Sequence, residues 1–245
     1  MPVHTSVIPV SGVKIPALYS GDPSSKIYVI VLHGLGVSKE VQIPELQRLM
    51  AEGFFAIAFD APHHGDREDG FLGIMERMPG EYERHLMLLK IIVQHAAEVE
   101  SLVRFYQEQG KKVAVVGISM GGFTAFATLL GRIKPDFCAP FLASPDFRSS
   151  KRPENFPETL LEKCGPADKP EVAFPTPMLI VNAGKDDIVS PKHSEKYYLK
   201  LQESYKESPE LLDYQRYDDS EHFMKASDWY DAWEKLLYRL HKLES

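Results

Sequence analysis

The chain has 245 residues, of which 44% are hydrophobic and 26% are charged, so it can bury a sizeable core and global disorder is not expected. The formal net charge is −7 and no basic cluster offsets it, which argues against a nucleic-acid or anionic-membrane partner. Two cysteines do not make a disulfide framework, and without a secretion signal or a membrane-spanning apolar run we expect a cytoplasmic location.

Apolar segments rich in β-branched residues alternate with helical patterns along most of the chain. The first two, 6–10 and 13–19, predict a hairpin that turns near Gly12. The next, 26–34, is an almost continuous apolar run, which is typical of a strand buried on both faces. Further strands are predicted at 54–60, 111–117, 137–144, 176–184 and 210–217.

Helical patterns fill the intervals between these strands. The longest is 81–109, in which apolar residues recur every three or four positions. The other predicted helices are 39–53, 121–131, 190–204 and 225–243. This alternation predicts an α/β fold with a mostly parallel central sheet of about eight strands, helices on both faces, and the opening hairpin antiparallel at one edge.

Two segments interrupt the alternation: 61–80 is rich in glycine and charge, and 145–175 is rich in proline. Neither is large enough for a second domain, so we predict a single domain over 1–245 with both segments as short lid loops near a site. Within the first segment, 71–78 fits a hydrophobic lid element and a buried surface helix equally well.

The stretch Gly117-Ile118-Ser119-Met120-Gly121 has the pattern G-x-S-x-G and lies between a predicted strand and a predicted helix. That context predicts a sharp turn which presents Ser119 above the sheet as a nucleophile. A serine hydroxyl needs a base within hydrogen-bond reach. His222, between the last strand and the last helix, has the right topological position, whereas His241 lies inside the final helix and is the weaker candidate.

Two further elements complete the predicted chemistry. Asp186 and Asp187 follow the strand at 176–184, and one of them is expected to orient the histidine. The oxyanion of acyl transfer needs fixed donors, which we expect to be the backbone N–H groups of Leu35 and Met120.

The stretches LHGLG, DAPHHGDR, GISMGG, AGKDDIVSP and SEHF, in this order, resemble the α/β-hydrolase superfamily, close to its small serine esterase and dienelactone-hydrolase-like branch. The resemblance covers 6–243 and implies the α/β-hydrolase fold without a large cap domain, a Ser-Asp-His hydrolase and no cofactor. The acid of that family commonly lies in D-x-hydrophobic-Val, which Asp186 matches directly and Asp187 matches only with the spacing shortened by one.

The chain departs from the family pattern in two places. Glu221 precedes the histidine where glycine is common, which brings a carboxylate near the site. Dienelactone hydrolases proper use a cysteine nucleophile, so Ser119 argues against that activity, and it also argues against a haloalkane dehalogenase, which needs an aspartate there.

DAPHHGDR resembles a turn that many of these proteins write as D-x-P-G-H-G. His63, His64 and Asp66 could suggest a metal, but such a short turn offers no complementary ligands, so we predict no metal and a structural turn beside the pocket. Residues expected to line that pocket are His33, Gly34, His63 and His64. Cys138 and Cys164 have no pairing or metal spacing and are predicted to be core thiols.

These features favour hydrolysis of a small-molecule carboxylic ester through an acyl-enzyme. The shortness of 145–175 leaves little room for a helical cap and favours small or short-acyl substrates. A thioesterase or a peptidase would use the same residues, and a non-catalytic small-molecule receptor on the same fold is the alternative from another class. The oligomeric state is left open.

Overall fold

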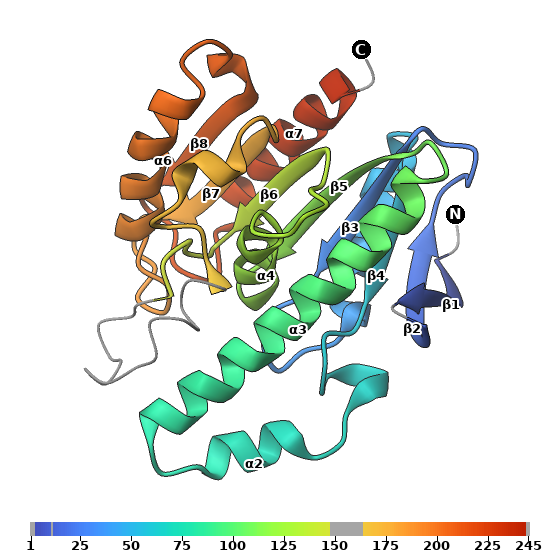
Figure 1. Cartoon of the computed structure of the whole chain (residues 1–245), viewed down its shortest axis with the longest axis vertical. Coiled ribbons are helices and arrows are strands. Elements are labelled where there is room, and N and C mark those ends of the chain that lie inside the picture. The colour runs from blue at the N-terminus through green and yellow to red at the C-terminus, as the bar shows by residue number, and fades with distance from the viewer. Residues whose placement is uncertain (1–2, 11, 148–163, 244–245) are drawn as a thin grey trace.

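The computed structural model describes residues 3–10, 12–147 and 164–243 (Figure 1). Within these ranges eight strands form one sheet in the order β1-β2-β4-β3-β5-β6-β7-β8. The strands are β1 (His4–Val10), β2 (Val13–Ser20), β3 (Ile27–Leu32), β4 (Phe55–Phe59), β5 (Lys112–Ile118), β6 (Phe137–Phe141), β7 (Met178–Ala183) and β8 (Leu212–Tyr217).

The sheet is mostly parallel. From β4 through β3, β5, β6 and β7 to β8, every neighbouring pair of strands is parallel. The opening hairpin supplies the exception, because β2 pairs antiparallel with both β1 and β4. The predicted sheet, with the hairpin at one edge, is therefore confirmed.

The helices lie where the sequence periodicity predicts them, with shifted ends. Residues 39–53 divide into a short 3₁₀ helix, Lys39–Gln42, and an α-helix, because Pro44 fits the first turn of an α-helix but not its interior. The α-helices are α1 (Ile43–Ala51), α2 (Phe71–Arg77), α3 (Glu81–Gln107), α4 (Met120–Thr128), α6 (Lys192–Ser204) and α7 (Ala226–Leu243). Further 3₁₀ turns are Gly65–Arg67, Pro170–Ala173 and Pro209–Leu211.

Helices cover both faces of the sheet, and β3 shows why its sequence is apolar throughout. All six of its side chains are buried. Alternate residues belong to different clusters: Val29 and Val31 pack with α1 and α7, whereas Ile30 and Leu32 pack with α3, α4 and α6. A strand buried on both faces has no polar side, which is what the continuous apolar run predicts.

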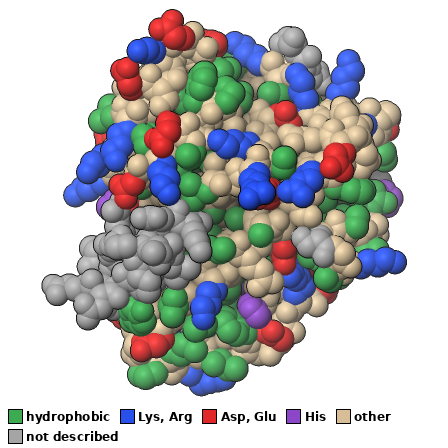
Figure 2. Space-filling view, in the orientation of Figure 1, with side chains coloured by type: hydrophobic (Ala, Val, Ile, Leu, Met, Phe, Trp, Pro, Cys, Tyr) green, Lys and Arg blue, Asp and Glu red, His purple; other side chains and the backbone are tan. Residues whose placement is uncertain are grey.

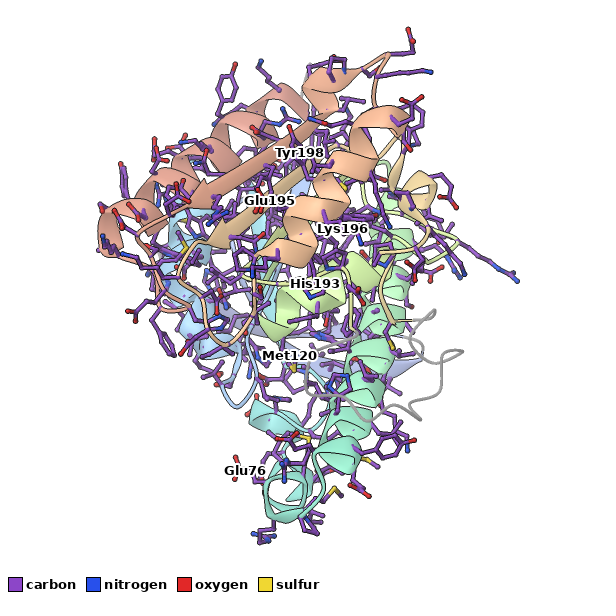
Figure 3. All side chains as sticks on the ribbon, turned by 90° about the vertical axis from the view of Figure 1, so that its left-hand side faces the viewer. Glu76, Met120, His193, Glu195, Lys196 and Tyr198 are labelled. Carbon is purple, nitrogen blue, oxygen red and sulfur yellow. The ribbon has the colours of Figure 1, made fainter. Side chains whose placement is uncertain are left out.

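One helix is longer than the sheet it covers. α3 has 27 residues, which makes it roughly 40 Å long at 1.5 Å per residue. Its N-terminal half, together with α2, projects past the strands (Figure 1). This arm is held by a third apolar cluster to which α2 contributes Met75 and α4 contributes Met120. In Figure 3, Met120 lies between the body of the molecule and α2, which carries Glu76.

Of the two segments predicted as lid loops, one is described in full by the structure and the other only at its ends. In 61–80 the structure forms a 3₁₀ turn and then α2, a surface helix that packs on α3 and in which only Met75 is buried. Of 145–175, residues 148–163 lie outside the described part of the chain. The two ends of that gap, Phe147 and Cys164, are both buried in the third apolar cluster.

The surface carries both signs of charge. On the face shown in Figure 2, acidic and basic side chains are interspersed with apolar ones. Among the described helices, none combines the length and the apolar character needed to cross a membrane.

Candidate active site

Ser119 alone connects β5 to α4, because β5 ends at Ile118 and α4 begins at Met120. Its backbone has φ 54° and ψ −117°, a conformation that side-chain-bearing residues rarely adopt and that costs free energy of order 1–3 kcal/mol. The turn is held from β6, since the N–H of Ser119 donates a 2.9 Å hydrogen bond to the carbonyl of Phe141. The sharp turn predicted from the sequence is present, and its strain falls on the serine.

Two glycines allow this turn to close. A Cβ on Gly117 would lie 2.0 Å from the carbonyl oxygen of Gly121, and a Cβ on Gly121 would lie 2.3 Å from the carbonyl oxygen of Leu32. Real Cβ atoms do not make such contacts, so both positions require glycine. The start of α4 therefore rests directly on the backbone at the end of β3.

Ser119, His222 and Asp186 form one chain of hydrogen bonds. His222 lies between β8 and α7, and its Nε2 is 3.0 Å from Oγ of Ser119. Its Nδ1 is 2.7 Å from Oδ2 of Asp186, which follows β7. Because a carboxylate accepts hydrogen bonds, Nδ1 carries the ring proton and Nε2 is the nitrogen that accepts from the serine hydroxyl.

The carboxylate of Asp186 is fixed at both oxygens. Oδ1 accepts hydrogen bonds from the backbone N–H groups of Ile188, at 2.9 Å, and Val189, at 2.7 Å. Its side chain has no exposed surface, whereas the neighbouring Asp187 is exposed. His241, the other candidate base, pairs with Glu52 instead. The structure thus brings Asp186 and His222 to the serine and leaves Asp187 and His241 apart from it.

The two predicted oxyanion donors lie beside Ser119. Met120 is the first residue of α4, where a backbone N–H has no partner inside the helix. On the other side, a Cβ on Gly34 would be only 3.6 Å from Cβ of Ser119, so the loop after β3 passes close to the serine. Leu35 and Met120 both line the same cavity as Ser119.

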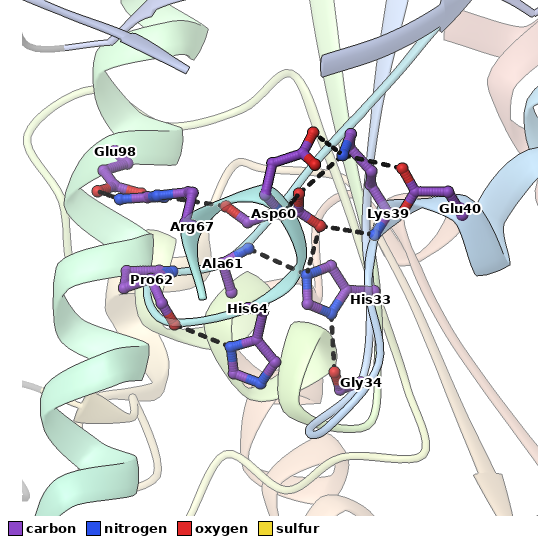
Figure 4. A network of polar contacts seen from close by, with 11 residues as sticks. His33, Gly34, Lys39, Glu40, Asp60, Ala61, Pro62, His64, Arg67 and Glu98 are labelled. Atoms are coloured by element: carbon purple, nitrogen blue, oxygen red, sulfur yellow. Dashed lines mark hydrogen bonds and ion pairs between the residues drawn. The ribbon is translucent and has the colours of Figure 1, made fainter. Parts of the chain in front are cut away.

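His33 holds that loop from below. Its ring is fully buried, with Nδ1 2.8 Å from the carbonyl of Gly34 and Nε2 accepting a 3.0 Å hydrogen bond from the N–H of Ala61 (Figure 4). Burial lowers the pKa of His33 to about 4. The ring is therefore neutral near pH 7, and Nδ1–H donates to Gly34, the residue before Leu35.

A buried ion pair, which sequence reasoning missed, braces the same loop. The ammonium of Lys39 is 2.8 Å from Asp60 and 2.7 Å from Asp66, and the backbone N–H of Lys39 donates to the other oxygen of Asp60 (Figure 4). Burial opposes the charge on Lys39, but its carboxylate partners raise its pKa above the ordinary value. Arg67 extends the network by bonding the carbonyl of Asp60 and the carboxylate of Glu98 on α3.

Of the four residues expected to line the pocket, Gly34 borders the cavity beside Ser119, and the structure places the three histidines elsewhere. His33 is buried beneath the loop, and His64 is 1% exposed with Nδ1 2.8 Å from the carbonyl of Pro62. His63 stacks on Phe71 and pairs with Asp69. His63 and His64 therefore make hydrogen bonds within the turn after β4, and these bonds keep both rings out of the cavity.

The sequence also raised the questions of a metal site and of the two cysteines. Within the described ranges, no group of three or more His, Cys, Asp or Glu side chains is arranged to hold a metal ion. Cys138 and Cys164 are both buried thiols, as predicted, and burial raises the pKa of Cys164 to about 12.

A cavity of about 720 Å³ opens in front of Ser119 and His222. Its walls come from the loop after β3, the start of α1, the N-terminal half of α3, and the loops that carry Asp186 and His222. A smaller hollow of about 380 Å³ between α2 and α3 shares some of these walls. The apolar lining of the large cavity includes Leu35, Val37, Val41, Leu88, Ile92, Ile118, Met120, Phe123, Leu142, Ile188, Val189, Phe223, Met224 and Trp229.

Comparison with known proteins gives the class to which this chain belongs. The model of the alpha/beta hydrolase family matches residues 29–242, and the chain is a member of that family. The family and fold predicted from the sequence motifs are therefore confirmed.

The individual proteins to which the chain is similar share only a small part of its sequence. The chain is 24% identical over 233 residues to a Bacillus subtilis (strain 168) protein named "Putative esterase YitV", a match that spans 84% of this chain and 88% of that protein. Its fold is similar to that of TT1662 from Thermus thermophilus, with a TM-score of 0.78, 23% identity and 100% of both chains covered. It is also similar to the Pyrococcus furiosus esterase Pf2001, with a TM-score of 0.66, 16% identity, and 99% and 91% of the respective chains covered.

The close approach of α4 to β3 can be tested with Gly121→Ala. The added Cβ would meet the Leu32 carbonyl at 2.3 Å, and overpacking of this kind lowers the free energy of unfolding by about 1–3 kcal/mol. Gly73→Ala in α2 is the matched control, because its Cβ meets only the end of Arg77 at 3.5 Å. Denaturant titrations of both variants measure the effect. Equal unfolding free energies for Gly121→Ala and the wild type would contradict the close approach.

The buried histidines predict a loss of stability in acid. Below about pH 6.5 the unfolded chain protonates its histidines, whereas folded His33 stays neutral down to about 4. The free energy of unfolding therefore falls as the pH drops through this window, by about 3 kcal/mol for His33 alone. Burial also lowers the pKa values of His64 and His95, which adds to the loss.

His95→Leu isolates one of these rings. His95 is fully buried and neither ring nitrogen has a hydrogen-bond partner in the described structure. The variant should be more stable than the wild type and should lose less stability per pH unit, by up to about 1.4 kcal/mol. Denaturation series between pH 4.5 and 7 measure the slopes, and a His95→Leu slope equal to that of the wild type would contradict the prediction.

Proposed function

We propose that this protein is a serine hydrolase that cleaves carboxylic esters through an acyl-enzyme. Ser119 is the nucleophile, His222 the general base and Asp186 the acid that orients it. The observation that carries the proposal is the hydrogen-bond chain Ser119–His222–Asp186, with distances of 3.0 and 2.7 Å, at the wall of a large apolar cavity. Membership of the alpha/beta hydrolase family supports it, as does the similarity to a protein named as an esterase.

In the proposed reaction His222 Nε2 accepts the hydroxyl proton of Ser119 as the oxygen attacks the ester carbonyl. Positive charge then develops on the imidazole, next to the buried carboxylate of Asp186. The N–H groups of Met120 and Leu35 stabilise the oxyanion. His222 next protonates the leaving alcohol, and it activates the water that hydrolyses the acyl-enzyme.

The cavity bears on substrate size. A volume of about 720 Å³ lies within the range of roughly 300–1,000 Å³ that is usual for pockets enclosing drug-sized ligands. The short-acyl preference expected from the sequence stays a prediction. The cavity volume leaves room for larger acyl or alcohol groups as well. A panel of 4-nitrophenyl esters from acetate to palmitate, with thioesters and aminoacyl amides, measures both the chain length and the bond preferred.

The nucleophile is tested with Ser119→Ala. The variant should fold as the wild type does, lose turnover of 4-nitrophenyl acetate, and no longer form a covalent adduct with a fluorophosphonate. Mass spectrometry of the labelled protein locates the adduct, which is expected on Ser119 in the wild type. A wild-type protein that forms no adduct while folded would favour the receptor alternative, and unreduced turnover by Ser119→Ala would refute the assignment.

The two adjacent aspartates provide a matched pair. Asp186→Asn removes the acceptor of the His222 Nδ1 proton, so kcat should fall by up to about 10⁴-fold, as is typical when the acid of such a triad is lost. Asp187→Asn changes an exposed neighbour and should have little effect. Initial rates on one ester measure both variants, and equal, mild losses would show that neither carboxylate orients the base.

A further inference from the structure

One wall of the cavity is polar. The 3₁₀ helix Lys39–Gln42 and the first turn of α1 contribute Gln42 and Glu45 to a lining that is otherwise mostly apolar. The proposed reaction uses neither side chain. Among the described residues, the lining contains no lysine or arginine, and Glu45 is its only acidic side chain.

Gln42 has a buried amide oxygen without a donor. The residue is 3% exposed, and Oε1 has no hydrogen-bond partner in the described structure. An unsatisfied buried polar atom costs about 1–3 kcal/mol, and native proteins contain few of them. This oxygen has almost no accessible surface of its own, so a donor in the cavity reaches it only when the amide of Gln42, a cavity residue, turns toward the ligand.

Glu45 adds a carboxylate to the same wall. Its Oε1 accepts a 3.2 Å hydrogen bond from the indole N–H of Trp229, another cavity residue. A carboxylate has about four acceptor positions, so this bond leaves acceptor capacity for a ligand. Burial raises the pKa of Glu45 although Trp229 and Arg48 oppose the shift. A ligand cation would relieve this unfavourable burial of negative charge.

A purely structural role explains only part of this arrangement. Glu45 lies in the first turn of α1, where a negative charge is stabilised by the helix dipole, and it anchors Trp229 of α7. That role does not require Gln42 to leave its amide oxygen unpaired one turn earlier. Gln42 and Glu45 lie on adjacent turns and both line the cavity, so one donor-bearing ligand can engage both side chains.

We propose that Gln42 and Glu45 form a subsite for a hydrogen-bond donor, so that the preferred esters carry an ammonium or hydroxyl group away from the reacting bond. This inference rests on the proposed esterase function. An ammonium group would pair with Glu45 and donate to Gln42, and a hydroxyl group would donate to one of them. A purely alkyl group leaves the amide unpaired, and an anionic group is repelled by the carboxylate of Glu45.

Matched substrates test the subsite. One series compares 4-nitrophenyl esters of hexanoate, 6-hydroxyhexanoate and 6-ammoniohexanoate. A second series carries the same groups on the alcohol part of an acetate ester, so that either orientation of the substrate is measured. The quantity compared is the ratio of kcat/KM for the donor-bearing ester to that for the alkyl ester, and in one series the wild type should favour the donor by about tenfold.

Variants assign the preference to residues. Glu45→Gln keeps the shape but removes the charge, and it should lower the ammonium-to-alkyl ratio by about tenfold. Gln42→Met removes the amide and should lower the hydroxyl-to-alkyl ratio. Glu52→Gln is the matched control, because Glu52 caps the other end of α1, is exposed and lies outside the cavity lining. Its ratios should equal those of the wild type.

Binding measurements separate failure of the subsite from failure of the esterase proposal. Hexylammonium should raise the melting temperature of the wild type more than hexanoate does, and Glu45→Gln should abolish the difference; this readout needs no turnover. Wild-type ratios near one in both series, or ratios unchanged in both variants, would overturn the subsite. Absence of ester hydrolysis and of a fluorophosphonate adduct would instead overturn the proposed function, with the melting temperatures still deciding the subsite.

Discussion

The close contact between α4 and the end of β3 is the constraint on which the site depends. Gly121 rests against the carbonyl of Leu32, and this forces the single connecting residue, Ser119, into a backbone with φ 54°. The serine is thereby set beside Gly34 in the loop that leaves β3. The sheet order reinforces the arrangement, because β3 and β5 are neighbours and their loops emerge side by side.

The loop after β3 is stabilised by buried polar groups of two kinds. Lys39 and Asp60 are charged and mutually paired, which offsets the cost of burying either one. His33 is buried without a full charge and uses both ring nitrogens to bond backbone groups on two loops. The ion pair and the histidine ring both bind backbone groups of the protein rather than substrate. Their role is to fix the N–H of Leu35, the proposed oxyanion donor, relative to Ser119.

Much of this could be predicted from the sequence, because it depends on local patterns. Three elements can be recognised from their own residues alone: the apolar run of β3, the apolar stripe of α3 and the G-x-S-x-G turn. The choice of Asp186 over Asp187 followed the family spacing, and the hydrogen bond to His222 agrees with it. The burial of Lys39 was not predictable, because its carboxylate partners approach from the loop after β4. His63 and His64 were expected in the pocket, but hydrogen bonds within their own turn hold them away from it.

The described cavity lining combines the reacting residues Ser119 and His222, the Gln42–Glu45 wall and His85 with mostly apolar side chains. Apolar walls keep the effective dielectric low, which strengthens the attraction between Asp186 and the imidazolium that forms in the proposed reaction. The same walls contribute little to orientation, because apolar contacts are not directional. A donor bound at Gln42 and Glu45 supplies that orientation. Binding energy gained there, on a part of the substrate that does not react, holds the ester carbonyl in position for attack by Ser119.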